Sequence, residues 1–330
     1  MTDALTPWWR GATIYQIYPR SFADSNGDGI GDLAGITAHL PYVASLGVDA
    51  IWLSPFFKSP MRDFGYDVSD YCDVDPIFGT LADFDALIAR AHDLGLRIIV
   101  DQVWAHTSDE HPWFIESRSS RQNDHADWYV WADAKPDGTP PNNWQSVFGG
   151  PAWTWDARRG QYYMHNFLKE QPQINLHNGK VQAAVLDIVR FWLDRGVDGF
   201  RIDAINHSMP DPQLRDNPPA PEDGRIRTRP YDFQIKRYSQ SHPDIPLFLE
   251  KVRSVFDEYP DRFTVAEVGG DDSDAEMKAF TQGDHRLNTA YGFDFLYAPK
   301  LTAPFLKDAL SRWPAEQGIG WPSWAFENHD

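Results

Sequence analysis

One pattern occurs three times along the chain: an amphipathic segment ends at a glycine, and a short apolar run follows it. The glycines are Gly47, Gly95 and Gly196. A glycine just after the last helical residue is typical of a left-handed helix cap, and the apolar run after it is typical of a buried parallel strand. Before Gly196, apolar residues recur at helical spacing over residues 181–192. The pattern therefore predicts repeated helix–strand units.

Further apolar runs complete the repeat. Together they predict seven strands, at residues 13–18, 48–53, 96–101, 197–203, 263–267, 290–295 and 324–326. Parallel strands that alternate with helices favour an α/β fold, a (β/α)8 TIM barrel that is incomplete because closure normally needs eight strands.

The spacing of the repeats indicates an insertion. Gly47 and Gly95 are 48 residues apart, whereas Gly95 and Gly196 are 101 apart. The extra chain is rich in Trp, Asn, Pro and Gly, which indicates little regular helix. We predict a first barrel part at residues 1–103, a small inserted B domain at 104–178, and a second barrel part at 179–330.

Composition limits the possible partners. The 330 residues carry a formal charge of −18, which disfavours nucleic acid and anionic membranes as partners. The single Cys72 requires no oxidising compartment, and we find no basic and apolar leader and no apolar run of 18 residues. These features predict a cytoplasmic protein, and we expect a monomer or weak homodimer.

Four acids lie at the ends of predicted strands, where barrel enzymes place their catalytic groups: Asp101, Asp203, Glu267 and Asp330. Arg201 lies two residues before Asp203 and therefore on the same face of its strand, so it can favour the ionised carboxylate that a nucleophile requires. The apolar strand before Glu267 can raise the pKa of its carboxyl, as a general acid requires. The acids together indicate glycoside cleavage.

At these residues the sequence resembles the α-amylase family of glycoside hydrolases, in its α-glucosidase and oligo-1,6-glucosidase branch. The motifs that carry the resemblance are residues 101–106, 199–203, 266–268 and 326–330. The resemblance implies that Asp203 is the nucleophile, Glu267 the acid/base and Asp330 the carboxylate that stabilises the transition state. It also implies that Arg201, His106 and His329 contact the bound glucose.

Residues 61–67 resemble the family's loop over the glucose at the non-reducing end. The resemblance implies that Asp63 binds its hydroxyls, that Tyr66 stacks on its face, and that Phe148 and Phe167 wall the pocket. A pocket closed in this way favours exo-acting glucosidases. Relatives continue through an eighth strand and a C-terminal β-domain, which we expect to be absent from this chain.

The expected activity is that of a retaining α-glucosidase acting on small α-glucosides such as maltose-like and aryl α-glucosides. Residues 171–175 are similar to a signature of the oligo-1,6-glucosidase branch but differ at Gln173 and Ile174, and Ala204 resembles members that prefer α-1,4 bonds. A transglucosylase that moves glucose to an acceptor sugar or alcohol is the alternative. A non-catalytic relative, such as an ancillary subunit of amino-acid transporters, is disfavoured because the three acids with implied catalytic roles are all present.

A loop near the N-terminus predicts a metal site. Oxygen-bearing side chains recur at alternate positions with a glycine at the sixth, as in the first part of an EF-hand, but the twelfth position is Gly35 instead of glutamate. We expect a structural Ca²⁺ or Mg²⁺ bound by Asp24, Asn26, Asp28, the Ile30 carbonyl and Asp32, and no cofactor for the chemistry. A plain turn rich in Asp and Asn is the alternative.

Overall fold

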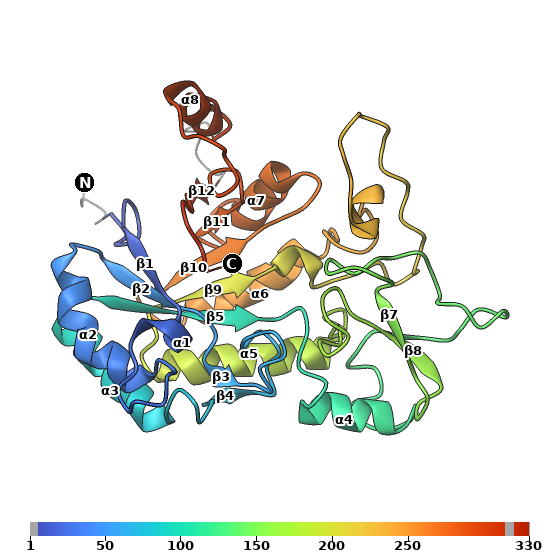
Figure 1. Ribbon diagram of the computed structural model, residues 1–330, viewed down its shortest axis with the longest axis horizontal. Coiled ribbons are helices and arrows are strands. Elements are labelled where there is room, and N and C mark those ends of the chain that lie inside the picture. Colours follow the sequence, from blue (N-terminus) through green and yellow to red (C-terminus); the bar gives the residue numbers. More distant parts are fainter. Residues whose placement is uncertain (1–5, 314–319, 330) are drawn as a thin grey trace.

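The computed structural model describes residues 6–313 and 320–329, so Asp330 lies outside the described residues. Its centre is a curled parallel sheet, a half-barrel of seven strands in the order β1-β2-β5-β9-β10-β11-β12 (Figure 1). The strands are β1 (Ile14–Ile17), β2 (Ala50–Leu53), β5 (Arg97–Val103), β9 (Gly199–Asp203), β10 (Phe263–Glu267), β11 (Thr289–Tyr291) and β12 (Trp321–Pro322). The structure thus confirms the prediction of an incomplete barrel.

Helices connect successive strands, as the repeat predicts. They are α1 (Pro19–Phe22), α2 (Leu33–Ser45), α3 (Leu81–Asp93), α5 (Gly179–Asp194), α6 (Ile245–Phe256), α7 (Ser273–Thr281) and α8 (Ala303–Ser311). In Figure 1, α2, α3 and α5 lie along one face of the sheet. Their apolar faces are buried: in α5, for example, Val181, Val185 and Trp192 pack in the core. No helix among the described residues is long and apolar enough to span a membrane.

The repeated glycines have the predicted conformation. Gly47, Gly95 and Gly196 have φ angles of 76°, 75° and 95°, in the left-handed region where a side chain is disfavoured. A different glycine sets the spacing of two central strands. At Gly199, the first residue of β9, an added Cβ would lie 2.5 Å from the Phe263 carbonyl oxygen of β10. The close approach of β9 and β10 therefore requires glycine.

The segment between β5 and α5 stands beyond the end toward which β5 points (Figure 1). It contains the short helix α4 (Pro112–Ser119) and an antiparallel sheet in the order β6-β8-β7. The strands of that sheet are β6 (Trp131–Ala132), β7 (Trp153–Asp156) and β8 (Gln161–Met164). This is the segment in which we predicted the inserted domain.

Three local features of the structure differ from what the sequence predicts. A hairpin of β3 (Phe57–Lys58) and β4 (Asp70–Val74) follows β2, and the sequence analysis did not predict it. The sixth strand ends at Tyr291 instead of continuing to Phe295. The seventh strand is Trp321–Pro322, so the prediction of residues 324–326 was wrong: Trp324 and Phe326 pack their rings on Phe295, with centroids 4.8 and 5.2 Å apart.

Candidate active site

Three of the predicted acids lie on neighbouring strands, Asp203 and Glu267 at the carboxyl ends of β9 and β10 and Asp101 two residues before the end of β5. β5 pairs with β9 and β9 with β10, and in this register Asp101 lies opposite Arg201. Asp203 is the last residue of β9 and Glu267 the last of β10. Parallel strands end at the same edge of a sheet, so the register brings side chains that are far apart in sequence to one place.

The Arg201 guanidinium is the centre of this cluster and is only 2% exposed. Its Nη1 donates to Asp203 Oδ1 at 2.6 Å and to Asp101 Oδ1 at 3.0 Å. Its Nη2 lies 2.7 Å from Glu267 Oε2. One buried cation therefore holds three carboxyl groups from three strands.

Two aromatic side chains enclose the guanidinium. Arg201 Nε donates to the Tyr291 hydroxyl at 3.0 Å, and its Cζ lies 4.8 Å from the centroid of the Trp52 ring. Trp52 also donates from Nε1 to Asp101 Oδ2 at 3.1 Å. Planar stacking together with bidentate hydrogen bonding is the role for which arginine is better suited than lysine.

Burial dominates the protonation of the acids. It raises the pKa of Glu267 to about 7, and the Arg201 charge offsets only part of that effect. Burial also raises the pKa of Asp203 to about 6, again against the lowering effect of Arg201. The same two causes raise the pKa of Asp101 to about 6. Burial therefore favours the protonated form of these carboxyls, as a general acid requires, whereas Arg201 favours the ionised form that a nucleophile requires.

The backbone turns sharply just after Asp203. Ala204 has a φ of 36° and a ψ of 42°, a left-handed conformation that is rare for a residue with a Cβ. Its N–H donates to Glu267 Oε2 at 3.3 Å. Such backbone strain clusters at functional sites, and here it aims a main-chain donor at the predicted acid/base.

A chain of hydrogen bonds joins His329 to the cluster. Gln16 Nε2 donates to His329 Nδ1 at 2.7 Å, so the ring proton lies on Nε2, which is 2.7 Å from the Tyr66 hydroxyl. The Tyr66 hydroxyl lies 3.3 Å from Asp101 Oδ2. The Tyr66 and His329 rings are also stacked, with centroids 5.5 Å apart. The structure therefore brings both predicted glucose contacts to the acids.

The remaining predicted contacts form a neighbouring group. His106 is buried, which lowers its pKa to about 4, and its ring lies 5.3 Å from Phe167. Phe148 lies 5.7 Å from Phe167, centroid to centroid, and is 57% exposed. Asp63 Oδ2 accepts a hydrogen bond from Gln171 Nε2 at 2.7 Å. Phe167 therefore contacts both rings, the buried His106 and the exposed Phe148 at the surface of the inserted segment.

Three residues of this site had no predicted role: Trp52, Tyr291 and Gln171. Asp101 was placed at a strand end with the other acids, but no role was assigned to it. The others depend on packing between distant strands and loops, which spacing along the chain does not reveal.

The predicted metal loop lies between α1 and α2, and its donor set of carboxylate, amide and carbonyl oxygens fits a hard cation. Asp24 accepts backbone hydrogen bonds from Gly27 at 2.7 Å and from Gly29 at 2.8 Å, and Asp28 accepts one from Ile30 at 2.8 Å. Asp32 caps α2 by accepting from Gly35 at 2.6 Å. These bonds turn the loop on itself, and they are also compatible with a plain turn.

Comparisons with known proteins agree with this geometry. The alpha-amylase catalytic domain matches residues 16–330. A probable alpha-glucosidase of Rhizobium meliloti (strain 1021) is 58% identical over an alignment 329 positions long, which covers 98% of this chain and 60% of that protein. An oligo-1,6-glucosidase of Heyndrickxia coagulans is 44% identical over an alignment 346 positions long, which covers 99% of this chain and 60% of the relative.

A crystal structure of the alpha-glucosyl transfer enzyme XgtA superposes with a TM-score of 0.95 at 56% identity and covers 98% of this chain and 61% of that one. The trehalulose synthase MutB of Pseudomonas mesoacidophila MX-45 superposes with a TM-score of 0.86 at 37% identity, covering 98% of this chain and 58% of that one. This chain spans about three fifths of the length of the relatives it matches. The match over residues 16–330 shows that the chain belongs to the alpha-amylase family and carries the catalytic-domain sequence of that family.

Proposed function

We propose that the chain is a retaining, exo-acting α-glucosidase that releases α-glucose from the non-reducing end of short α-glucosides. The observation that carries the proposal is the single Arg201 guanidinium that holds Asp101, Asp203 and Glu267, which come from three neighbouring strands. A pair of carboxyl groups from neighbouring strands is the arrangement that glycoside cleavage uses. The names of the relatives, alpha-glucosidase and oligo-1,6-glucosidase, support the same substrate class.

In the proposed first step, Asp203 attacks the anomeric carbon while Glu267 donates its proton to the departing glycosidic oxygen. The bond from the anomeric carbon to the aglycone breaks, a bond to Asp203 forms, and a glucosyl-enzyme results. In the second step, the Glu267 carboxylate takes a proton from water, which attacks the same carbon and releases α-glucose and free Asp203. We assign to Asp330 the stabilisation of the transition state, on the family resemblance alone.

The glucose contacts are proposed at the non-reducing end. His106, His329, Arg201 and Asp63 would bind hydroxyl groups, and Tyr66 would stack on the sugar face. Phe148 and Phe167 would wall the entrance. We further propose small α-glucosides such as maltose-like and aryl α-glucosides as substrates, with a preference for α-1,4 bonds, and a cytoplasmic monomer or weak homodimer.

The test is release of chromophore from an aryl α-glucoside by the purified chain. Asp203→Asn keeps the size of the side chain but removes the nucleophile, so we expect activity to fall by at least about 10³-fold. Asp284→Asn is the matched control because the Asp284 side chain is fully exposed and should leave the rate unchanged. Equal rates in wild type and Asp203→Asn, or no release by wild type, would contradict the proposal.

Transglucosylation is the second candidate, and one comparison favours it: XgtA is described as an alpha-glucosyl transfer enzyme. Both activities share the glucosyl-enzyme and differ in whether water or an acceptor hydroxyl attacks it. Product analysis with and without an added acceptor alcohol separates them. A glucosylated acceptor in excess over free glucose would assign transfer, and glucose alone would assign hydrolysis.

We also propose that the loop at residues 24–32 binds a structural Ca²⁺ or Mg²⁺. The support is its set of oxygen donors, Asp24, Asn26, Asp28, Asp32 and the Ile30 carbonyl. The ion would stabilise the connection between α1 and α2 and would take no part in the chemistry.

A further inference from the structure

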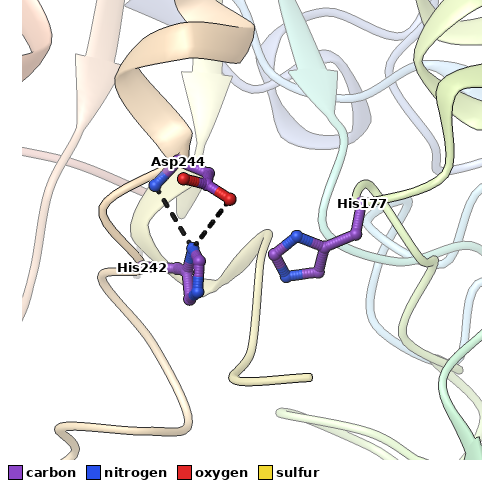
Figure 2. A group of neighbouring side chains, drawn as sticks. All are labelled: His177, His242 and Asp244. Atoms are coloured by element: carbon purple, nitrogen blue, oxygen red, sulfur yellow. Dashed lines mark hydrogen bonds and ion pairs between the residues drawn. The ribbon is translucent and has the colours of Figure 1, made fainter. Parts of the chain in front are cut away.

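Two histidines and an aspartate meet at the start of two barrel helices (Figure 2). His177 lies just before α5, and His242 and Asp244 lie just before α6. One ligand-type atom from each side chain lies within 4.8 Å of the other two. Among the described residues, no other group of three or more His, Cys, Asp or Glu side chains brings its ligand atoms so close together. No residue of the proposed active site belongs to it.

His177 is already oriented as a ligand. Its Nε2 lies 2.8 Å from the Pro210 carbonyl oxygen, which can only accept, so the ring proton lies on Nε2. Nδ1 therefore keeps a free lone pair. A histidine that donates its other ring N–H to a backbone carbonyl is the arrangement that fixes metal-binding imidazoles in proteins.

The other two side chains are available as well. Asp244 is the N-cap residue of α6, yet its carboxylate makes no capping hydrogen bond. Its Oδ2 lies 3.7 Å from His242 Nδ1, and the side chain is half exposed, which leaves a route from solvent. His242 Nδ1 accepts only a long hydrogen bond, 3.2 Å, from the Asp244 N–H.

We propose that His177, His242 and Asp244 bind a divalent transition-metal ion, with Zn²⁺ as the best match. Two imidazoles and one carboxylate are a zinc donor set, whereas Ca²⁺ and Mg²⁺ prefer oxygen ligands alone. Metal–ligand bonds of about 2.0–2.2 Å place tetrahedral donors about 3.4 Å apart, so the three side chains close by about 1 Å through side-chain rotation. Water completes the coordination.

The bound ion acts as a cross-link. It joins the exit of the inserted segment, at His177, to the end of the long connection that begins after Asp203 and ends at α6. That connection carries the strained Ala204. An ion that binds only the folded chain stabilises it by mass action, so the expected effect is on stability and independent of the proposed glucosidase activity.

The experiment is calorimetric titration of the tag-free chain with ZnCl₂ in excess Mg²⁺, which saturates oxygen-only sites. We expect one Zn²⁺ per chain and a higher melting temperature in its presence. His177→Gln, His242→Ala and Asp244→Asn should each weaken binding by about tenfold or more. His285→Gln is the matched control, since His285 is an exposed histidine beside Glu250 and Asp284 and should bind no ion tightly.

Titration with Co²⁺ reports independently on the coordination geometry of the bound ion. Four- or five-coordinate binding should produce a visible absorption band that Asp244→Asn shifts or removes, and this conservative change at a half-exposed side chain is expected to leave the fold intact. Unchanged Zn²⁺ affinity in all three variants, or absence of Zn²⁺ binding by the folded wild-type chain, would overturn the proposal.

Discussion

The middle and the C-terminal end of the parallel sheet are packed in different ways. Every residue of β9 and β10 is buried, and α6 between them contributes six buried side chains to the core. β11 and β12 have only three and two residues, and α8 buries Ala309 alone. In Figure 1, α8 stands apart from the layer formed by the other helices. The candidate acids Asp203 and Glu267 lie in the packed region.

Two arginines illustrate this difference in packing. Arg201 in β9 and Arg312 after α8 each bind more than one acid, yet the Arg201 side chain is 2% exposed and that of Arg312 is 34% exposed. Water and salt screen the second cluster but not the first. The same residue type thus has a structural and chemical role in one region and a minor role in the other.

Removal of Arg201 should give the largest effect. Arg201→Met leaves Asp101, Asp203 and Glu267 buried without their cation, and we expect a loss of about 3–5 kcal/mol in the free energy of unfolding, together with loss of activity. Arg312→Met breaks pairs with Asp274 and Asp294 and should cost about 1 kcal/mol or less. Urea unfolding measures both. Similar losses for the two variants would refute the distinction between the regions.

Two leucines test packing without charge. Leu249 in α6 is fully buried, whereas Leu310 in α8 is 54% exposed. Leu249→Ala should cost about 2–5 kcal/mol because it leaves a cavity, and Leu310→Ala should stay within about 0.5 kcal/mol. If Leu310→Ala were the more damaging change in urea unfolding, α8 would have to be packed more tightly than the structure shows.

The buried Glu267 in this packed region should also make the free energy of unfolding depend on pH. Because the pKa of Glu267 is raised to about 7 from an ordinary value of 4.5, the folded chain binds this proton more tightly than the unfolded chain. The resulting stabilisation is fully present below pH 4.5 and is lost as pH rises through 7. Glu267→Gln should therefore be more stable than wild type at about pH 8 and should lose this part of the pH dependence.

Urea unfolding of both proteins at about pH 5 and about pH 8 gives the measurement. Groups distant from Glu267 contribute equally to wild type and variant, so the difference between the two proteins reports Glu267 together with the acids coupled to it, Asp101 and Asp203. A variant less stable than wild type at the higher pH would show that the Glu267 carboxylate is held favourably in the folded state, against the burial that we describe.

The smallest effect is expected in the loop at residues 24–32, which is exposed over residues 24–29. If it binds Ca²⁺ or Mg²⁺, an ion concentration of ten times the dissociation constant raises the free energy of unfolding by about 1.4 kcal/mol. Asp24→Ala should abolish that gain, and Asp49→Ala, at an aspartate outside the loop, should not. A gain that persists in Asp24→Ala would place the ion elsewhere.

The sequence predicted the features that local pattern determines. The helix-capping glycines, the central strands and the shared face of Arg201 and Asp203 were all found, because each depends on residues close together in the chain. One electrostatic expectation was incomplete: Arg201 lowers the pKa of Asp203, but burial outweighs it and leaves a net rise. The depth of burial is a property of the fold and does not appear in the spacing of two residues.

What the sequence missed depends on contacts between distant segments. Asp101 joins the cluster through the register of β5 and β9, and His177 meets His242 only when α5 and α6 are side by side. The seventh strand was misplaced because the aromatic residues 324–326 are typical of a strand, whereas in the fold they pack on Phe295.

The most direct test of the central claim is to trap the covalent intermediate on the nucleophile. A 5-fluoro-α-glucosyl fluoride carries a reactive leaving group, while its ring fluorine slows the second step by destabilising the positively charged transition state. After incubation and proteolysis, mass spectrometry should find one fluoroglucosyl group on the peptide with Asp203, and none in Asp203→Asn. A label on Glu267 or on another residue would contradict the account.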